Sequence, residues 1–182
     1  MSKRIMILNG SPRAAGNTAM LIKAFTEGAK DAGNEVTCFD LGEMNIHPCR
    51  GCCKGGKDHN SPCVQKDDMD KIYPVYRQAD IVVLASPLYY WTISGQLKCA
   101  FERLFAVAEC NADLANPIKE SILLMAAEGH GFDETLYWYD HLEKHIGWKS
   151  LGKVLCGGVF NVGDIEGRNE LKEAYELGKS IK

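Results

Sequence analysis

A stretch of small and polar residues follows the first apolar run of the chain, in the order Asn9-Gly10-Ser11-Pro12-Arg13-Ala14-Ala15-Gly16-Asn17-Thr18. Within it, Ser11, Asn17 and Thr18 offer hydrogen bonds, and Arg13 offers a positive charge. A helix that begins near Asn17 leaves its first backbone N–H groups unpaired and carries the positive end of its dipole, which favours a phosphate. The stretch therefore predicts an anion-binding loop, with an ordinary strand-to-helix turn as the alternative.

This loop matches neither of the two common nucleotide-binding patterns. In G-x-x-x-x-G-K-[ST] a lysine follows the second glycine, whereas Asn17 follows Gly16 here. The pattern G-x-G-x-x-G does not occur in the stretch either. The loop therefore gives little support to an ATPase.

Three consecutive aromatic residues follow a second apolar run, in Ser86-Pro87-Leu88-Tyr89-Tyr90-Trp91. Aromatic faces and backbone amides suit a planar, partly polar ring. In an extended segment neighbouring side chains point to opposite faces, so Tyr89 and Trp91 cannot share a face with Tyr90. Some of the three are therefore structural, and each is either a ligand contact or part of the core or of a subunit contact.

A third segment that could border the same ligand follows a later apolar run, in Glu128-Gly129-His130-Gly131. Its two glycines allow the backbone to approach a ring closely. His130 is either a hydrogen-bond or proton donor to that ring or, as we expect, a polar loop residue.

Four thiols lie within fifteen residues, at Cys49, Cys52, Cys53 and Cys63. They belong to a segment at about 42–67 that is rich in Gly, Cys, Pro and charge and lacks periodicity, which indicates an ordered or functional insertion. Such a density of thiols raises a [4Fe–4S] cluster or zinc as a bound group. The imperfect spacing favours a third interpretation, a cysteine-rich insertion without metal.

The elements that position these residues follow from the hydrophobic pattern. Apolar runs between turn residues predict five strands, at about 5–8, 35–41, 79–87, 121–127 and 154–160. Helical spacing predicts the intervening helices, at about 17–32, 68–76, 95–108, 132–146 and 166–181. This alternation predicts a three-layer α/β sandwich with a parallel sheet of order 2-1-3-4-5, the flavodoxin order. Its ligand site lies at the carboxyl ends of strands one and three, where the loops at 10–18 and 86–91 would meet.

Composition limits the remaining classes. With 182 residues and 46% apolar content, we expect one domain over residues 1–182. The 21 basic and 24 acidic residues form no block of like charge, so neither nucleic acid nor a membrane surface is an expected partner. The apolar run behind Lys3-Arg4 is too short for a signal peptide, and no transmembrane stretch occurs. Eight cysteines without an export signal indicate reduced thiols, metal ligands or core residues in preference to a disulfide framework, and hence the cytoplasm.

Taken together, the motifs resemble those of the flavodoxin-like, NAD(P)H-dependent FMN reductases, which are related to iron–sulfur flavoproteins. The matching segments are Asn9–Arg13 with Gly16–Thr18, and Ser86–Tyr90 with Ser94–Lys98 and Phe101–Arg103. The resemblance implies that the FMN phosphate is bound by Ser11, Arg13, Asn17 and Thr18. It implies that the isoalloxazine is bound by Pro87, Leu88, Tyr89, Tyr90 and Trp91. Glu128 and Gly129 are assigned to the ring by position.

The same resemblance bears on the thiols. In iron–sulfur flavoproteins two C-x-x-C steps precede the last cysteine, whereas Gly55 stands here where the third thiol would fall. Cys53 would have to substitute for it, and two adjacent cysteines bind one cluster awkwardly.

We therefore expect an FMN-dependent oxidoreductase in which NAD(P)H reduces FMN and the flavin passes electrons to a second acceptor, a small molecule or a protein. The flavin carries this chemistry, so no catalytic acid or base is required. Family members usually dimerise across the flavin site, and we expect a homodimer. The alternatives are an FMN-binding electron carrier, an iron–sulfur flavoprotein without NAD(P)H activity of its own, and a flavin-free interaction domain on the same fold.

Overall fold

The structure is a computed structural model that describes residues 2–182. Five parallel strands form one sheet in the order β2-β1-β3-β4-β5, as the sequence predicts. The strands are β1 (Arg4–Asn9), β2 (Glu35–Asp40), β3 (Ile81–Pro87), β4 (Glu120–Ala126) and β5 (Lys149–Cys156). The helices are α1 (Asn17–Asp31), α2 (Met69–Gln78), α3 (Gly95–Arg103), α4 (Phe105–Ala108), α5 (Asp133–Ile146) and α6 (Asn169–Lys179), with a short 3₁₀ turn, η1 (Leu41–Glu43).

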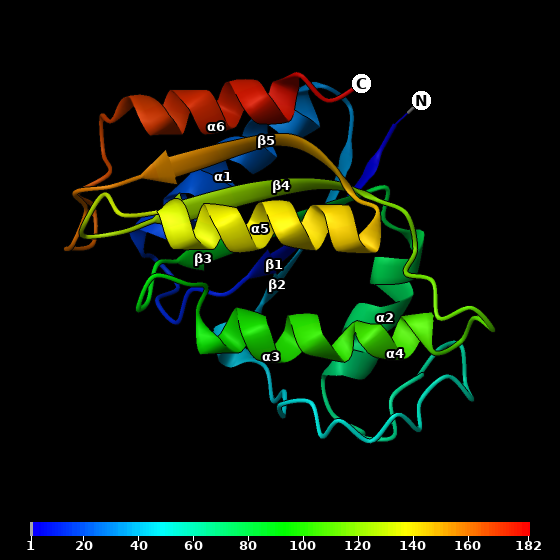
Figure 1. The fold of residues 1–182 in the computed structure, drawn as a ribbon. Coiled ribbons are helices and arrows are strands. Elements are labelled where there is room, and N and C mark those ends of the chain that lie inside the picture. The colour runs from blue at the N-terminus through cyan, green and yellow to red at the C-terminus, as the bar shows by residue number, and fades with distance from the viewer. Residues whose placement is uncertain (1) are drawn as a thin grey trace.

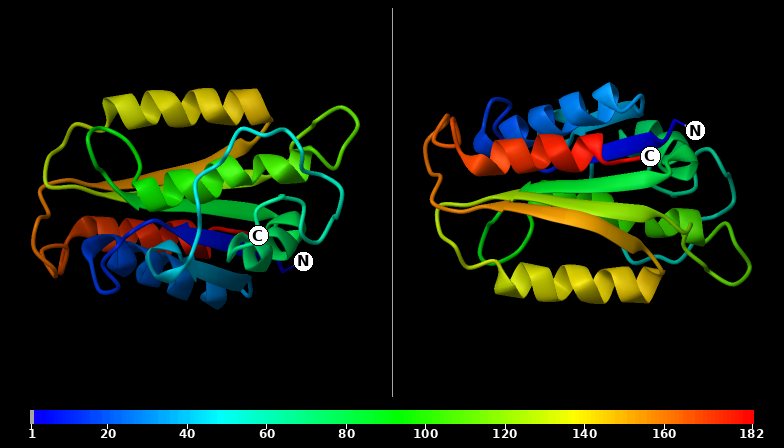
Figure 2. Two further views of the ribbon diagram at one scale, coloured as in Figure 1. Left: turned by 90° about the horizontal axis from the view of Figure 1, so that it is seen from below. Right: turned by 90° about the horizontal axis from the view of Figure 1, so that it is seen from above.

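Helices cover both faces of the sheet (Figures 1 and 2). Alternate residues of the central strands point into two separate cores, so that in β1 Ile5 and Ile7 face α1 and α6 while Met6 and Leu8 face α2, α3 and α5. This alternation on fully buried strands produces the three layers. Two glycines, Gly28 of α1 and Gly178 of α6, bring their helices close, because a Cβ on either would strike backbone atoms of the other helix.

The fifth strand lies earlier in the chain than the apolar pattern predicts. It spans Lys149–Cys156 and not 154–160, because Gly157 and Gly158 end it, the latter with a φ of +74°. This edge strand carries Lys149 and Lys153, which interrupt the apolar run. Residues 157–160 are instead the start of a loop that reaches the candidate site.

Two helix boundaries also differ from the prediction. The helix expected at 95–108 is divided into α3 and α4 at Leu104, and the last helix begins at Asn169, because residues 161–167 form turns. Among residues 2–182, none of the helices has the length and apolar character needed to cross a membrane.

Residues 44–68, called here the cysteine segment, contain neither helix nor strand and run along α2, α3 and α4 (Figure 1). Arg103 of α3 binds residues near both ends of this segment. Its guanidinium forms two bonds to the Asp67 carboxylate, at 2.8 and 3.2 Å, and donates to the carbonyls of His47 and Gln65 at 2.9 and 3.2 Å. Its Nε donates to Cys63 Sγ at 3.2 Å. One buried side chain therefore fixes both ends of the segment.

Candidate functional site

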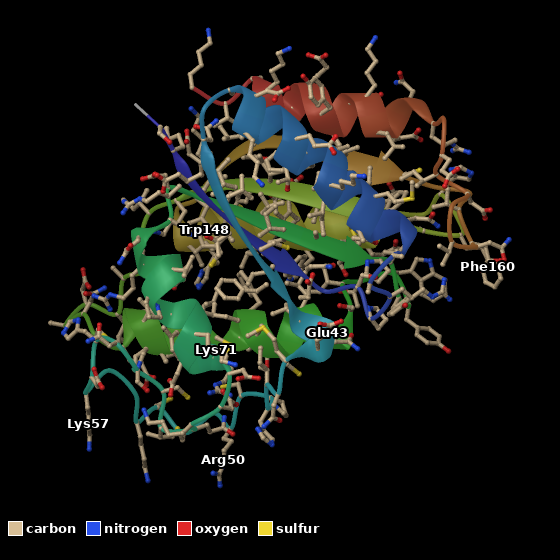
Figure 3. The ribbon with its side chains drawn as sticks, turned by 180° about the vertical axis from the view of Figure 1, so that it is seen from behind. Glu43, Arg50, Lys57, Lys71, Trp148 and Phe160 are labelled. Atoms are coloured by element: carbon tan, nitrogen blue, oxygen red, sulfur yellow. The ribbon has the colours of Figure 1, made fainter. Side chains whose placement is uncertain are left out.

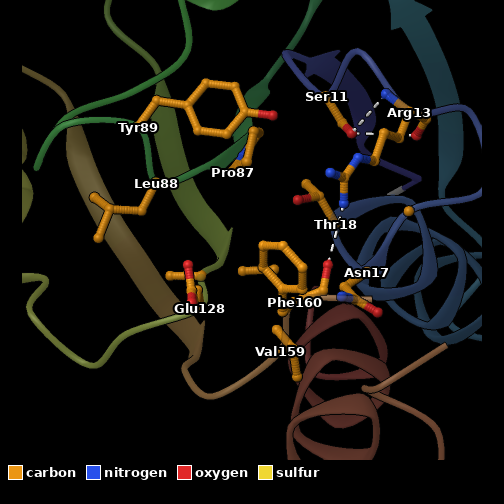
Figure 4. Close-up of a pocket in the computed structure, with 13 residues that line it drawn as sticks. Ser11, Arg13, Asn17, Thr18, Pro87, Leu88, Tyr89, Glu128, Val159 and Phe160 are labelled. Carbon is orange, nitrogen blue, oxygen red and sulfur yellow. Dashed lines mark hydrogen bonds between the residues drawn. The ribbon is translucent and has the colours of Figure 1, made fainter. Parts of the chain in front are cut away.

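A cavity of about 180 Å³ lies at the carboxyl ends of β1 and β3, where the strand order reverses (Figure 4). The residues that line it come from four chain segments and are Ser11, Arg13, Gly16, Asn17, Thr18, Pro87, Leu88, Tyr89, Ala126, Ala127, Glu128, Val159 and Phe160. Eight of the predicted site residues are among them, and Tyr90, Trp91 and Gly129 are not. The two loops that the sequence predicts to meet do so here.

The loop after β1 is ordered by its own side chains. Asn9 donates to Asp40 of β2 at 2.8 Å, and its oxygen accepts the Ser11 N–H at 3.0 Å. The Ser11 hydroxyl in turn accepts the Arg13 N–H at 3.2 Å (Figure 4). Hydrogen bonds of this local kind fix a tight turn in place of a continuing strand.

Gly10 lets this loop touch the start of α3. Ser94 caps α3 by accepting the Leu97 N–H at 3.2 Å, and its hydroxyl donates to the Gly10 carbonyl at 2.7 Å. A Cβ on Gly10 would lie only 2.7 Å from Leu97 Cβ. The distance between the two loops of the site thus depends on a residue without a side chain.

The first turn of α1 forms the end of the cavity at which the sequence predicts an anion-binding loop. Gly16 caps this helix without a side-chain hydrogen bond, so no side-chain oxygen of the cap residue pairs with the amides of its first turn. Thr18 and Asn17 lie in this turn and line the cavity. Thr18, the backbone amides of this turn and the Arg13 guanidinium are the donors here that a phosphate requires.

Two of these residues also bind the loop that follows β5. Arg13 donates to the Phe160 carbonyl at 3.1 Å (Figure 4), and Asn17 donates to the Asn161 carbonyl at 2.9 Å. The Asn17 oxygen accepts the Ile165 N–H at 3.4 Å. Both side-chain polar atoms of Asn17 are therefore engaged by the loop, and its first role is to position it.

Asp164 orders the same loop from within. Its carboxylate accepts the N–H groups of Asn161 and Phe160 at 2.7 and 2.9 Å. These backbone hydrogen bonds lower the pKa of Asp164 below its usual value. The ionised carboxylate of Asp164 thus accepts both N–H groups and orders the start of the loop.

The aromatic stretch is a tight turn and not an extended segment. Tyr89 and Thr92 exchange backbone hydrogen bonds of 2.9 and 3.2 Å, and Tyr90 and Trp91 between them have φ values of +48° and +61°. Positive φ at both central positions belongs to a type I′ turn, which is strained for bulky residues. Consequently Tyr89 alone of the three lines the cavity, while Tyr90 is 92% and Trp91 59% exposed.

In the segment Glu128–Gly131, the predicted residue Glu128 borders the cavity and the predicted residue Gly129 does not. Glu128 lines the cavity, whereas His130 packs against Gly157, where a Cβ would collide with the imidazole. His130 is therefore a polar loop residue that fits against the end of β5. Val159 and Phe160 complete this side, and sequence analysis missed them because it assigned both to a strand.

The lining fits a phosphorylated ligand with a planar ring. Donors gather at the α1 end, and Leu88, Tyr89 and Pro87 form an apolar wall across the cavity from them (Figure 4). Sites that enclose a whole cofactor measure about 300–1,000 Å³, so a cavity of about 180 Å³ surrounds only part of a molecule such as FMN.

A doubly wound sheet with a helix terminus and an aromatic turn at its switch point defines a flavodoxin-like flavoprotein. The chain belongs to the NADPH-dependent FMN reductase family, whose pattern matches residues 3–157.

Curated relatives carry a second description. An iron–sulfur flavoprotein of Archaeoglobus fulgidus is 30% identical over 174 residues, which cover 94% of this chain and 76% of that protein. An iron–sulfur flavoprotein of Methanosarcina thermophila is 31% identical over 133 residues, or 73% of this chain and 69% of that protein. The resemblance to FMN reductases related to iron–sulfur flavoproteins is thus confirmed.

Solved structures share the fold. An NAD(P)H:quinone oxidoreductase from Methanothermobacter marburgensis superposes with a TM-score of 0.72 at 18% identity, covering 100% of both chains. An FMN-dependent NADH-azoreductase from Bacillus anthracis, solved in complex with FMN, has a TM-score of 0.70 at 14% identity and covers 97% of this chain and 98% of its own. These likenesses confirm the flavodoxin-like fold.

Proposed function

We propose that the protein is an FMN-dependent oxidoreductase that takes electrons from NAD(P)H and passes them to a second acceptor. The observation that carries this proposal is the cavity at the strand switch point, where the α1 terminus and Arg13 face the wall formed by Leu88 and Tyr89. The family description and the quinone and azo-dye reductases of the same fold support it.

In this proposal the residues of the chain bind and orient the cofactor. Ser11, Thr18 and the amides of the first turn of α1 hold its phosphate, and Arg13 neutralises part of the charge. Leu88 and Tyr89 hold the ring. Phe160, which belongs to the loop after β5, covers the ring on the side of that loop. Bound FMN would supply the redox chemistry, since it can take two electrons and a proton as hydride and return them one or two at a time.

No side chain that lines the cavity is needed as a proton donor. Glu128 and Arg13 are its charged groups, and each stands where it can bind or orient a ligand. The second proton that accompanies two-electron reduction of an acceptor can come from water, because the cavity is open to solvent.

We further propose that the protein acts as a homodimer in the cytoplasm. The turn at Tyr90 and Trp91 exposes large aromatic surface beside the cavity, which supports a subunit contact there. Light scattering at micromolar concentration should give twice the mass of the chain, and a monomer mass would contradict the dimer.

Steady-state kinetics test the activity. Protein loaded with FMN should oxidise NADPH or NADH in the presence of a quinone, at a rate that depends on both substrates in a ping-pong pattern. Protein that binds FMN tightly but leaves NADPH and NADH unoxidised would be an electron carrier instead.

A further inference from the structure

The turn from Tyr89 to Thr92, beside the flavin cavity, has a strained backbone. Its two central residues, Tyr90 and Trp91, have φ values of +48° and +61°. Bulky L-residues rarely adopt this left-handed conformation, and they keep it only where the surrounding structure imposes it. The contacts of the turn should therefore include one that opposes its relaxation.

The chain is held in place on either side of this turn. Before it, the Leu88 N–H donates to the Ala126 carbonyl of β4 at 3.1 Å. After it, the Ser94 N–H donates to the hydroxyl of Ser86, which is buried at the end of β3, at 2.8 Å. These hydrogen bonds fix where the chain enters and leaves the turn. They do not bind either of the two residues that have positive φ.

A side chain of α5 binds the turn at one of those two residues. The Thr135 hydroxyl donates to the Trp91 carbonyl at 2.8 Å. Thr135 lies in the first turn of α5 and is completely buried, whereas Trp91 is exposed. A β-branched side chain on a helix is restricted at χ1, so the helix sets the position of this hydroxyl. Helix α5 thus supplies a fixed donor beneath an exposed turn.

The form of the turn decides where Tyr89 lies. Tyr89 pairs with Thr92 through two backbone hydrogen bonds, and its side chain lines the flavin cavity beside Leu88. Relaxation of Tyr90 and Trp91 to negative φ would splay the two ends of the turn and separate this backbone pair. Tyr89 would then leave the apolar wall of the cavity.

We propose that Thr135 is a positioning residue for the flavin ring, because its hydroxyl holds the Tyr89–Thr92 turn in the strained form and thereby keeps Tyr89 against the ring. This role rests on the proposed function, since the ring is that of bound FMN. The contact acts at the aromatic wall of the cavity. The end formed by α1, where the proposed function places the phosphate, is not part of it.

Amide hydrogen exchange in the flavin-free protein tests whether Thr135 holds the turn. Thr135→Val keeps the shape of the side chain and removes its hydroxyl. It should lower the protection of the Tyr89 and Thr92 amides about tenfold, because one hydrogen bond is lost. Thr135→Ser retains a hydroxyl and should restore most of this protection. Thr92→Val is the matched control, because it makes the same change at an exposed position of the turn and should leave the protection unchanged.

Equilibrium binding of FMN and of riboflavin tests the consequence for the ring. Both ligands carry the ring and only FMN carries the phosphate, so Thr135→Val should weaken both by the same factor, about tenfold. Thr135→Ser and Thr92→Val should bind both ligands nearly as tightly as the wild type, whereas Arg13→Ala should weaken FMN alone. The cysteine segment is not involved, because its Arg50 and the cavity residue Phe160 lie at different edges of the molecule (Figure 3).

Unchanged affinity of Thr135→Val for both flavins, in a wild type that binds them, would overturn this role and leave the proposed oxidoreductase standing. Unchanged amide protection in Thr135→Val would overturn it as well. The role would also fail if Thr135→Ser bound the flavins as weakly as Thr135→Val, because the hydroxyl would then not be what holds the turn. Wild-type protein that binds neither flavin would contradict the proposed function and, with it, the role of Thr135.

Discussion

Arg103 of α3 and Asp67 of the cysteine segment form an ion pair in which both partners' side chains are 1% exposed. Two N–H groups meet two carboxylate oxygens, which is the strongest arrangement of this pair. The resemblance to FMN reductases includes Arg103 among its matching residues, yet the structure places it at the cysteine segment and not at the flavin cavity. Its function is to close that segment on the body of the protein.

Removal of the charge from this pair should destabilise the protein strongly. Asp67→Asn leaves a buried guanidinium without its counter-charge, and the expected loss is about 3–5 kcal/mol in the free energy of unfolding. Glu102→Gln, in the exposed pair with Lys98, is the matched control and should cost about 0–1 kcal/mol. Urea denaturation measures both, and equal effects would contradict the structural importance of the buried pair.

The same ion pair should make the free energy of unfolding depend on pH in the acid range. Burial raises the pKa of Asp67, but hydrogen bonds from Arg103, His47 and Met69 outweigh it, and the pKa lies below its usual 3.8. The contribution of Asp67 is therefore complete above about pH 4 and is lost as the pH falls through the lowered value. Asp67→Asn should show a smaller loss of stability in this range than the wild type does.

Lys119 should make the free energy of unfolding depend on pH in the alkaline range. Its side chain is buried and donates to the carbonyls of Arg77 and Ala79 at the end of α2, and burial lowers its pKa to about 8. Between about pH 8 and 10.5 the unfolded chain binds this proton and the folded protein does not, so stability rises with pH by up to about 1.4 kcal/mol per unit. Lys119→Met should remove this rise relative to wild type. An unchanged slope would contradict the shifted titration.

The contact between the two loops of the cavity is tested at Gly10. Gly10→Ala places a Cβ 2.7 Å from Leu97 Cβ and should cost about 1–3 kcal/mol of stability while weakening FMN binding. Gly95→Ala is the control, because nothing lies within 4 Å of its Cβ, and it should leave both quantities nearly unchanged. Isothermal titration with FMN compares the two, and tight binding by Gly10→Ala would show that the loops need not touch.

The phosphate assignment is tested at Arg13. Loss of its charge-assisted contact should weaken FMN binding by about 1.5–3 kcal/mol, or about 10- to 150-fold. Lys23→Ala removes an exposed charge from α1 that does not line the cavity, and it should have little effect. Unchanged affinity in Arg13→Ala would contradict a role for this guanidinium in phosphate binding.

The order of the sheet could be predicted because its central strands are continuous apolar runs. The edge strand β5 could not be bounded, since Lys149 and Lys153 point to solvent or to side-chain partners and break the pattern. The loop beyond it was therefore assigned to the strand, and Phe160 was missed as a lining residue. Edge strands carry polar residues by necessity, which weakens their signal in a single sequence.

The candidate site was predicted best where local chemistry specifies the geometry. Asn9 and Ser11 order the first loop through neighbouring atoms, and Asn17 begins a helix as expected. The turn at Tyr90 and Trp91 could not be predicted, because bulky residues rarely adopt positive φ and the strain depends on the surrounding structure. Contacts between distant segments, such as Glu109 with Gly55, required the fold itself.

The visible absorption spectrum of protein purified without oxygen tests the central claim most directly, when it is followed by release of the chromophore and addition of NADPH. The proposed function predicts flavin bands that belong to FMN and bleach when NADPH is added. A colourless protein that does not take up added FMN would contradict it, and the loops at Ser11 and Pro87 would then be purely structural.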